Sequence, residues 1–197
     1  MTDNKMRTEI LNIDKGQCLT DVLPAIPANT IFDKTITGCG ATHSEIVNAA
    51  RHSIIIEPNI PVILGKKAEH PFLFAVYEGI TKEDVKAYLA GEHDGYRKII
   101  TTPEGFDKKV LPAMHELEIP VYKDYFLLFD ECEKAIQDVG YRGDIYLPVE
   151  DFFKFENKAM VSATPIVPSD PRFEENGFKI LKLVPTYDSR IELTLCT

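Results

Sequence analysis

Small, hydroxyl-bearing and acidic residues follow four short apolar segments of this sequence, and their types suit phosphate and metal chemistry. The four sets are TITGCGAT at 35–42, TTPEG at 101–105, DECE at 130–133 and SATP at 162–165. Glycines allow backbone N–H groups to approach phosphate oxygens. A hydroxyl after such a turn and a carboxylate from another strand are the oxygen ligands that hold Mg²⁺ beside a nucleoside triphosphate.

Strands that alternate with helices must position these residues. The apolar patterns predict strands at 29–34, 53–57, 72–77, 98–102, 125–129, 158–162, 178–184 and 190–196. Helical patterns lie at 42–50, 81–90, 106–117, 131–139 and 148–156. Strands that are apolar throughout are typical of a parallel sheet covered on both faces. We therefore predict an α/β fold, with a mostly parallel sheet whose strand ends bring the four sets to one edge.

Two helix boundaries carry local signals. Thr42 or Ser44 is expected to cap the helix at 42–50, because a hydroxyl can accept a hydrogen bond from the first turn. Pro112 interrupts the helical spacing of residues 106–117, so this helix is expected to be kinked or to start late.

Composition narrows the class of protein. The chain has 197 residues, of which 44% are hydrophobic, so it can bury a sizeable core. Its net charge of −9 argues against a stand-alone nucleic-acid module, because affinity for phosphate backbones depends on lysine and arginine. The sequence has no apolar run near the roughly 20 residues that span a bilayer and no secretory signal at its start, which predicts no membrane contact and a cytoplasmic location.

The cysteines do not indicate a zinc site or a disulfide framework. They stand far apart and form no C-x-x-C pair, so all are expected to be reduced thiols: Cys18, Cys39, Cys132 and Cys196. A nucleophilic role for Cys39 or Cys132 is a minor alternative, since no histidine is placed by the sequence to activate either thiol.

Taken in order, the motifs resemble the first RecA-like domain of superfamily-two (DEAD/DEAH-like) helicases, a P-loop NTPase fold, over about residues 30–165. TGCGAT matches the phosphate-binding loop, which implies nucleotide contacts from Thr37, Gly38, Cys39, Gly40, Ala41 and Thr42. DECE resembles the DExx box. The resemblance implies that Asp130 and Thr42 hold the metal and that Glu131 orients the attacking water.

The remaining motifs resemble loops with other tasks. Two sets match loops that touch the nucleic-acid backbone, namely Pro58 and Asn59, and Thr102, Pro103, Glu104 and Gly105. Glu57 is unusual for such a loop, where a neutral or basic residue would serve better. A third set is similar to the motif that couples nucleotide state to domain movement, namely Ser162, Ala163 and Thr164.

One position departs from the family pattern. Ala41 stands where the phosphate-binding loop has its lysine, which neutralises charge on the β- and γ-phosphates. Loss of such a charge typically costs on the order of 10²–10³ in rate, so hydrolysis is expected to be impaired or lost. Lys34 precedes the loop and is the one residue that we consider as a replacement.

The resemblance also implies a larger protein. We expect residues 1–28 to be an N-terminal extension, residues 29–172 the RecA-like domain, and residues 173–197 an exit segment toward a second RecA-like domain. The implied cofactors are ATP and Mg²⁺, and the implied partner is DNA or RNA, contacted through the full-length protein. Whether the chain is an enzyme stays open. The alternative is an inactive RecA-like binding or structural module, favoured by Ala41, whereas retention of both Asp130 and Glu131 favours a working site.

Overall fold

A single parallel sheet organises the chain. The computed structural model describes residues 6–35, 38–132, 149–164, 168 and 170–188. Its strands are β1 (Thr8–Ile13), β2 (Thr30–Asp33), β3 (His52–Ile56), β4 (Phe74–Val76), β5 (Lys98–Thr101), β6 (Tyr125–Phe129), β7 (Asn157–Ser162) and β8 (Lys179–Pro185). These strands form one sheet in the order β1-β8-β2-β7-β6-β3-β5-β4, and every neighbouring pair is parallel. The predicted α/β class with a parallel sheet is confirmed.

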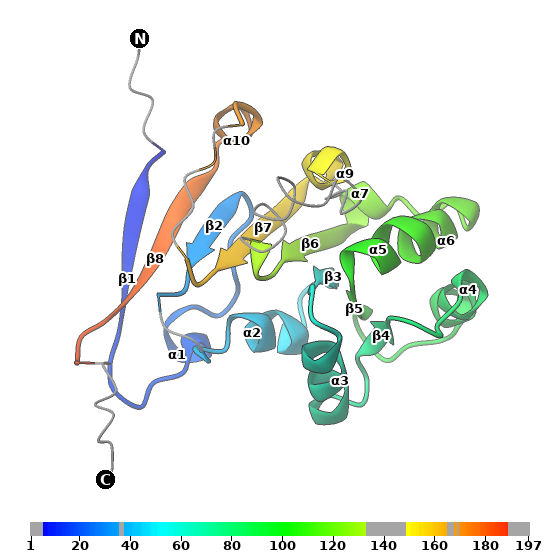
Figure 1. The fold of residues 1–197 in the computed structure, drawn as a ribbon, viewed down its shortest axis with the longest axis horizontal. Coiled ribbons are helices and arrows are strands. Elements are labelled where there is room, and N and C mark those ends of the chain that lie inside the picture. The colour runs from blue at the N-terminus through cyan, green and yellow to red at the C-terminus, as the bar shows by residue number, and fades with distance from the viewer. Residues whose placement is uncertain (1–5, 36–37, 133–148, 165–167, 169, 189–197) are drawn as a thin grey trace, which may run out of the picture.

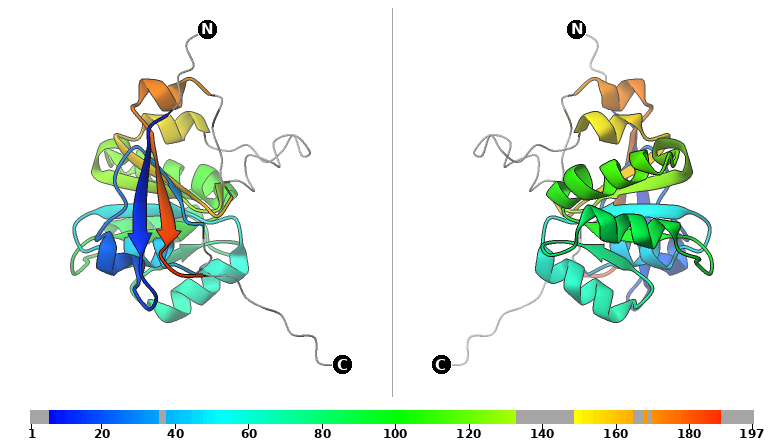
Figure 2. Two further views of the ribbon diagram at one scale, coloured as in Figure 1. Left: turned by 90° about the vertical axis from the view of Figure 1, so that its left-hand side faces the viewer. Right: turned by 90° about the vertical axis from the view of Figure 1, so that its right-hand side faces the viewer.

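Helices cover both faces of the sheet (Figures 1 and 2). One face packs against α1 (Leu19–Val22), α2 (Ala41–Val47) and α3 (Ile60–Glu69). The other packs against α4 (Lys82–Ala90), α5 (Pro103–Gly105), the π-helical turn η1 (Phe106–Val110), α6 (Leu111–Glu116), α7 (Val121–Asp124), α9 (Val149–Lys154) and α10 (Arg172–Glu175). The sheet is therefore the middle of three layers.

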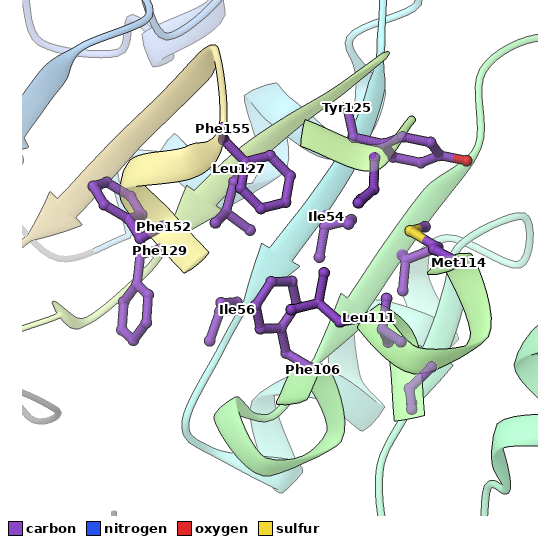
Figure 3. Close-up of a cluster of buried hydrophobic side chains, with 14 of the residues drawn as sticks. Ile54, Ile56, Phe106, Leu111, Met114, Tyr125, Leu127, Phe129, Phe152 and Phe155 are labelled. Atoms are coloured by element: carbon purple, nitrogen blue, oxygen red, sulfur yellow. The ribbon is translucent and has the colours of Figure 1, made fainter. Parts of the chain in front are cut away.

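Successive side chains of the central strands point to opposite faces of the sheet, so the core consists of two clusters. Ile54 and Ile56 of β3 pack with Phe106 in the cluster on the α5–α6 side, which Figure 3 shows in close-up. Ile55 belongs to the other cluster, together with Ile46 of α2. Each of these isoleucines is almost fully buried, and such burial stabilises the fold by about 1.5–3 kcal/mol per side chain. Where the backbone stays extended beyond the end of a strand, the same alternation decides on which face of the sheet the next side chain lies.

Most predicted strands exist within one or two residues of their expected limits. The segments at 29–34, 53–57, 72–77, 98–102, 125–129, 158–162 and 178–184 correspond to β2 through β8 in chain order. The expected strand at 190–196 lies outside the described residues, as does almost all of the expected helix at 131–139.

Two segments outside the expected domain core join the same sheet. β1 and β8 pair with each other from Thr8 with Ile180 to Ile13 with Pro185, and β8 also pairs with β2. The sequence analysis did not predict β1, whose side chains are mostly exposed or half-buried. It also missed α3, which follows the cap residue Asn59.

Two local expectations had different outcomes. Pro112 lies in the first turn of α6, which begins at Leu111, so this α-helix starts late as expected; a proline there lacks only an N–H that would have no intrahelical partner. The residues before it are also helical, since α5 begins at Pro103 and the π-helical turn η1 leads into α6. The expected cap of α2 was wrong. The N-cap of α2 is Gly40, and the Ser44 hydroxyl instead donates to the Ala41 carbonyl at 2.7 Å.

A buried ionic cluster ties α2 to the starting ends of β3 and β5. The Glu45 side chain is fully buried and accepts hydrogen bonds from Arg51 at 2.5 Å and from Ser53 at 2.5 Å. Lys98 lies 3.5 Å from the same carboxylate, and burial lowers the pKa of Lys98 to about 8. Arg51 also stacks on the ring of Phe126 at 3.4 Å.

We predict that Glu45→Ala lowers the free energy of unfolding by about 3–5 kcal/mol, because it leaves Arg51 and Lys98 without their buried counterion. Urea denaturation measures the loss. The matched control is Glu116→Ala, which removes an exposed carboxylate that pairs with Lys82 and Lys86 and should change little. Equal losses in the two variants would contradict a structural role for the buried cluster.

Candidate functional site

Two residues that are far apart in the sequence meet at the carboxyl edge of the sheet. Thr42 lies in the first turn of α2, and Asp130 directly follows β6. The Thr42 hydroxyl donates a hydrogen bond to Oδ2 of Asp130. Asp130 is only 3% exposed, and its backbone N–H donates to the Ile56 carbonyl, so the hydrogen bonding between β6 and β3 continues to the residue after β6. The end of the glycine turn thus lies beside the first acidic residue.

The turn between β2 and α2 depends on two glycines in the left-handed region. Gly38 has φ +73° and Gly40 has φ +88°, conformations that residues with a Cβ rarely adopt. The carbonyl of Cys39, between them, accepts a hydrogen bond from the Leu19 N–H at 3.3 Å. The chain from α1 therefore anchors the turn. Thr37 lies outside the described residues.

Lys34 reaches the same carboxylate from the other side. Its Nζ lies 3.3 Å from Oδ1 of Asp130, and its side chain is 12% exposed. Burial opposes the charge of Lys34, yet attraction and a hydrogen bond to Asp130, together with the charge of Glu131, leave the pKa of this lysine raised. One carboxylate therefore joins a lysine that precedes the glycine turn to a threonine that follows it.

The second acid of the pair is held by an asparagine. The Asn59 side-chain amide donates to Glu131 at 2.9 Å and to Glu57 at 3.0 Å. Glu131 adopts a left-handed backbone with φ +47°, and its N–H donates to Oδ1 of Asp130 at 2.9 Å. Asn59, predicted only as a nucleic-acid contact, thus bridges two carboxyl groups. The unusual Glu57 was the signal in the sequence that this loop differs from the family pattern.

Glu57 is a buried acid of this edge whose pKa is strongly shifted. It is 1% exposed, and burial, followed by the charges of Asp130 and Glu131, raises its pKa to about 7 against the opposing hydrogen bonds from Asn59. Near neutral pH, Glu57 is therefore partly protonated at this edge.

The other predicted residues form turns of their own. Thr102 caps α5 and accepts a hydrogen bond from the Gly105 N–H at 3.0 Å, while Glu104 pairs with Lys108 on the surface. Ser162 exchanges hydrogen bonds with Thr164 across Ala163, and its carbonyl accepts from the Lys34 N–H at 2.9 Å. The loop after β7 is thereby joined to the loop after β2. The contacts predicted for Pro58 and for residues 102–105 with nucleic acid stay predictions.

Among the described residues, no group of three or more His, Cys, Asp and Glu side chains is placed to hold a metal ion unaided. Mg²⁺ in nucleotide sites is commonly held by one or two protein oxygens together with the substrate phosphates, so Thr42 and Asp130 fit that part of a site.

In the same described part of the chain, no helix has the length and apolar character needed to cross a membrane. Burial raises the pKa of Cys39, which disfavours the thiolate that a nucleophilic role requires.

Fold and edge together define a parallel α/β domain with a hydroxyl, a lysine and acidic side chains converging beyond the strand ends. No family model matches the chain, and no curated protein matches it. Among solved structures, the chain is similar to the helicase domain of Hef from Pyrococcus furiosus, with 14% sequence identity and a TM-score of 0.48. The match covers 81% of this chain and 35% of that chain, so this chain spans about a third of that structure's length.

The raised pKa of Glu57 predicts a pH-dependent stability. A carboxyl group whose pKa is about 7 in the folded state and 4.5 in the unfolded state contributes stability that is complete below pH 4.5 and is lost as the pH rises through 7. We expect the free energy of unfolding to fall by about 1–3 kcal/mol between pH 5 and pH 7.5 because of this group.

The measurement is urea denaturation at both pH values for the wild-type protein and for Glu57→Gln, which keeps the shape and cannot ionise. The decrease should be smaller in the variant. The same decrease in both proteins would assign the pH dependence to other groups.

Proposed function

We propose that this chain is a helicase-like motor domain that binds a magnesium–nucleoside triphosphate at the edge formed by residues 38–42 and 130–131. The observation that carries the proposal is the contact between the Thr42 hydroxyl and the Asp130 carboxylate, contributed by elements 88 positions apart. This pairing of a hydroxyl after a glycine turn with a carboxylate at the same edge of the sheet would be the protein part of a nucleotide–metal site.

Thr42 and Asp130 would hold the metal ion. Both present oxygen atoms, the donor type that Mg²⁺ prefers. Thr42 is half-buried and Asp130 is buried. When bound, Mg²⁺ would neutralise negative charge on the phosphates. Gly38 and Gly40 supply a turn without side chains at the place where the phosphates would approach the backbone.

Glu131 would orient the attacking water. Its carboxylate is next to Asp130 in the sequence, and Asn59 fixes one of its oxygens. A carboxylate can accept a proton from the nucleophile only if it is held within hydrogen-bond reach of it. Ala41 supplies no charge to the phosphates, because its side chain is a methyl group, which is buried in the apolar cluster with Ile46. We therefore infer that hydrolysis is slow.

Nucleic acid would be bound by the full-length protein. The loops at 58–59 and 102–105 follow β3 and β5 at the same edge as the nucleotide site, and residues 162–164 would transmit the nucleotide state to a second RecA-like domain. With a net charge of −9, this chain alone offers little general attraction for a polyanion. The 197-residue chain by itself should not unwind a duplex, and clear unwinding in a strand-displacement assay would refute this.

The second candidate function is a binding or structural module that retains the fold without hydrolysis, and the buried Ala41 favours it. Comparison of wild-type hydrolysis with that of Glu131→Gln separates the two. A wild-type rate above that of the variant supports the motor. Equal rates, with nucleotide binding intact in both proteins, support the module.

We predict that the wild-type chain binds MgATP and that Thr42→Val and Asp130→Asn each weaken binding by about tenfold or more, because each removes one metal-side oxygen contact. Isothermal titration calorimetry measures the affinity, with EDTA in a parallel titration to remove Mg²⁺. Asp107→Asn is the matched control, since Asp107 is an exposed acid in η1 on the other face of the sheet.

Thermal unfolding of each variant establishes that it is folded before it is titrated. Thr42→Val is the more stringent variant, since it keeps the shape of the side chain and leaves the Lys34–Asp130 ion pair in place. Wild-type protein that fails to bind MgATP at millimolar concentration would refute the proposed site, and so would unchanged affinity in both edge variants.

A further inference from the structure

The position of Lys34 suggests how the edge compensates for Ala41. Lys34 and Thr42 contact the two oxygens of one carboxylate, Oδ1 and Oδ2 of Asp130. The ammonium and hydroxyl groups are therefore neighbours, although one precedes the glycine turn and the other follows it. The positive charge of Lys34 therefore lies beside Thr42 and Asp130, where the proposed metal and phosphates would bind.

The backbone of β2 directs Lys34 toward this place. Phe32 packs in the same cluster as Ala41, on the α2 side of the sheet, and Lys34 is two residues further along. The Lys34 N–H donates to the Ser162 carbonyl at 2.9 Å, so the extended conformation continues through this residue and Lys34 shares the face of Phe32. The chain turns only at Thr35, which has φ +47°.

Lys34 is held in an ion pair with the carboxylate of the proposed site. Its side chain is 12% exposed, and its ammonium lies 3.3 Å from Oδ1 of Asp130. Asp130 is the carboxylate that the proposed site shares with a metal cation. Once its charge is shared in this way, Lys34 requires another anion, because a buried ammonium without a counterion is costly. Triphosphate oxygens beside Thr42 would supply it.

From this geometry we propose that Lys34, reaching the edge from the end of β2, takes over the phosphate-binding charge that Ala41 does not provide. The inference rests on the proposed nucleotide site and names the residue that contacts the terminal phosphates. The competing explanation is that Lys34 serves only as the counterion of Asp130. The two explanations differ in whether the effect of removing the charge depends on the number of phosphates.

The experiment is calorimetric titration of MgATP, MgADP and AMP into four proteins: wild type, Lys34→Met, Lys34→Arg and Lys34→Met combined with Ala41→Lys. Methionine keeps the length and apolar stem of the side chain and removes its charge. Lys179→Met is the matched control, because Lys179 forms a 2.7 Å ion pair with Glu9 at the other end of the sheet. Thermal unfolding confirms that each variant is folded.

We expect Lys34→Met to weaken MgATP binding by about tenfold or more, to affect MgADP less, and to leave AMP unchanged. Lys34→Arg should retain affinity within about threefold, since its charge also suits phosphate. The double variant should recover part of the loss, and Lys179→Met should match the wild type.

Three results would overturn the inference in distinguishable ways. No MgATP binding by the wild type overturns both the inference and the proposed function. Wild-type binding with unchanged affinity in Lys34→Met overturns the inference alone and leaves the nucleotide site standing. An equal loss for all three nucleotides assigns Lys34 to support of Asp130 rather than to contact with phosphate.

Discussion

The common direction of the strands is the constraint on which the candidate site depends. In a parallel sheet, the residue that follows each strand emerges at the same edge, whatever its distance along the chain. β2, β7 and β6 lie side by side, so the residues after β2 and after β6 are separated by one strand only. The register of β2 with β7 and of β7 with β6 places Lys34 level with Ala163 and Asp130 level with Val161, two residues apart, and the lysine side chain spans this offset. An antiparallel strand among these three would send its following residue to the opposite edge.

Acidic side chains at the two edges of the sheet have different partners. Lys34 pairs directly with Asp130, and the charge of Glu131 also acts on it. Glu131 is held by Asn59, while Glu57, the most deeply buried, retains its proton to about pH 7. The ion cluster of Glu45 at the other end of the sheet is satisfied by two cations and a serine.

Much of the architecture was predictable from local patterns. Apolar runs located β2 through β8, because a strand that is buried on both faces requires apolar residues at successive positions. The edge strand β1 was missed, since only part of each of its faces is covered and its pattern is weak. The π-helical turn η1 before α6 was also missed, because the spacing of apolar residues in the sequence does not distinguish a π-helical turn from an α-helical one.

The sequence by itself determined which chemical groups follow each strand: a glycine turn ending in Thr42, an acidic pair at 130–131, and alanine in place of a lysine. Only the tertiary structure decided which of these groups meet. Lys34 contacts Asp130 and Asn59 contacts Glu131 because of strand order, register and side-chain alternation, all of which join residues far apart in the chain. Spacing along the sequence carries no information about such pairs, because packing between distant elements fixes them.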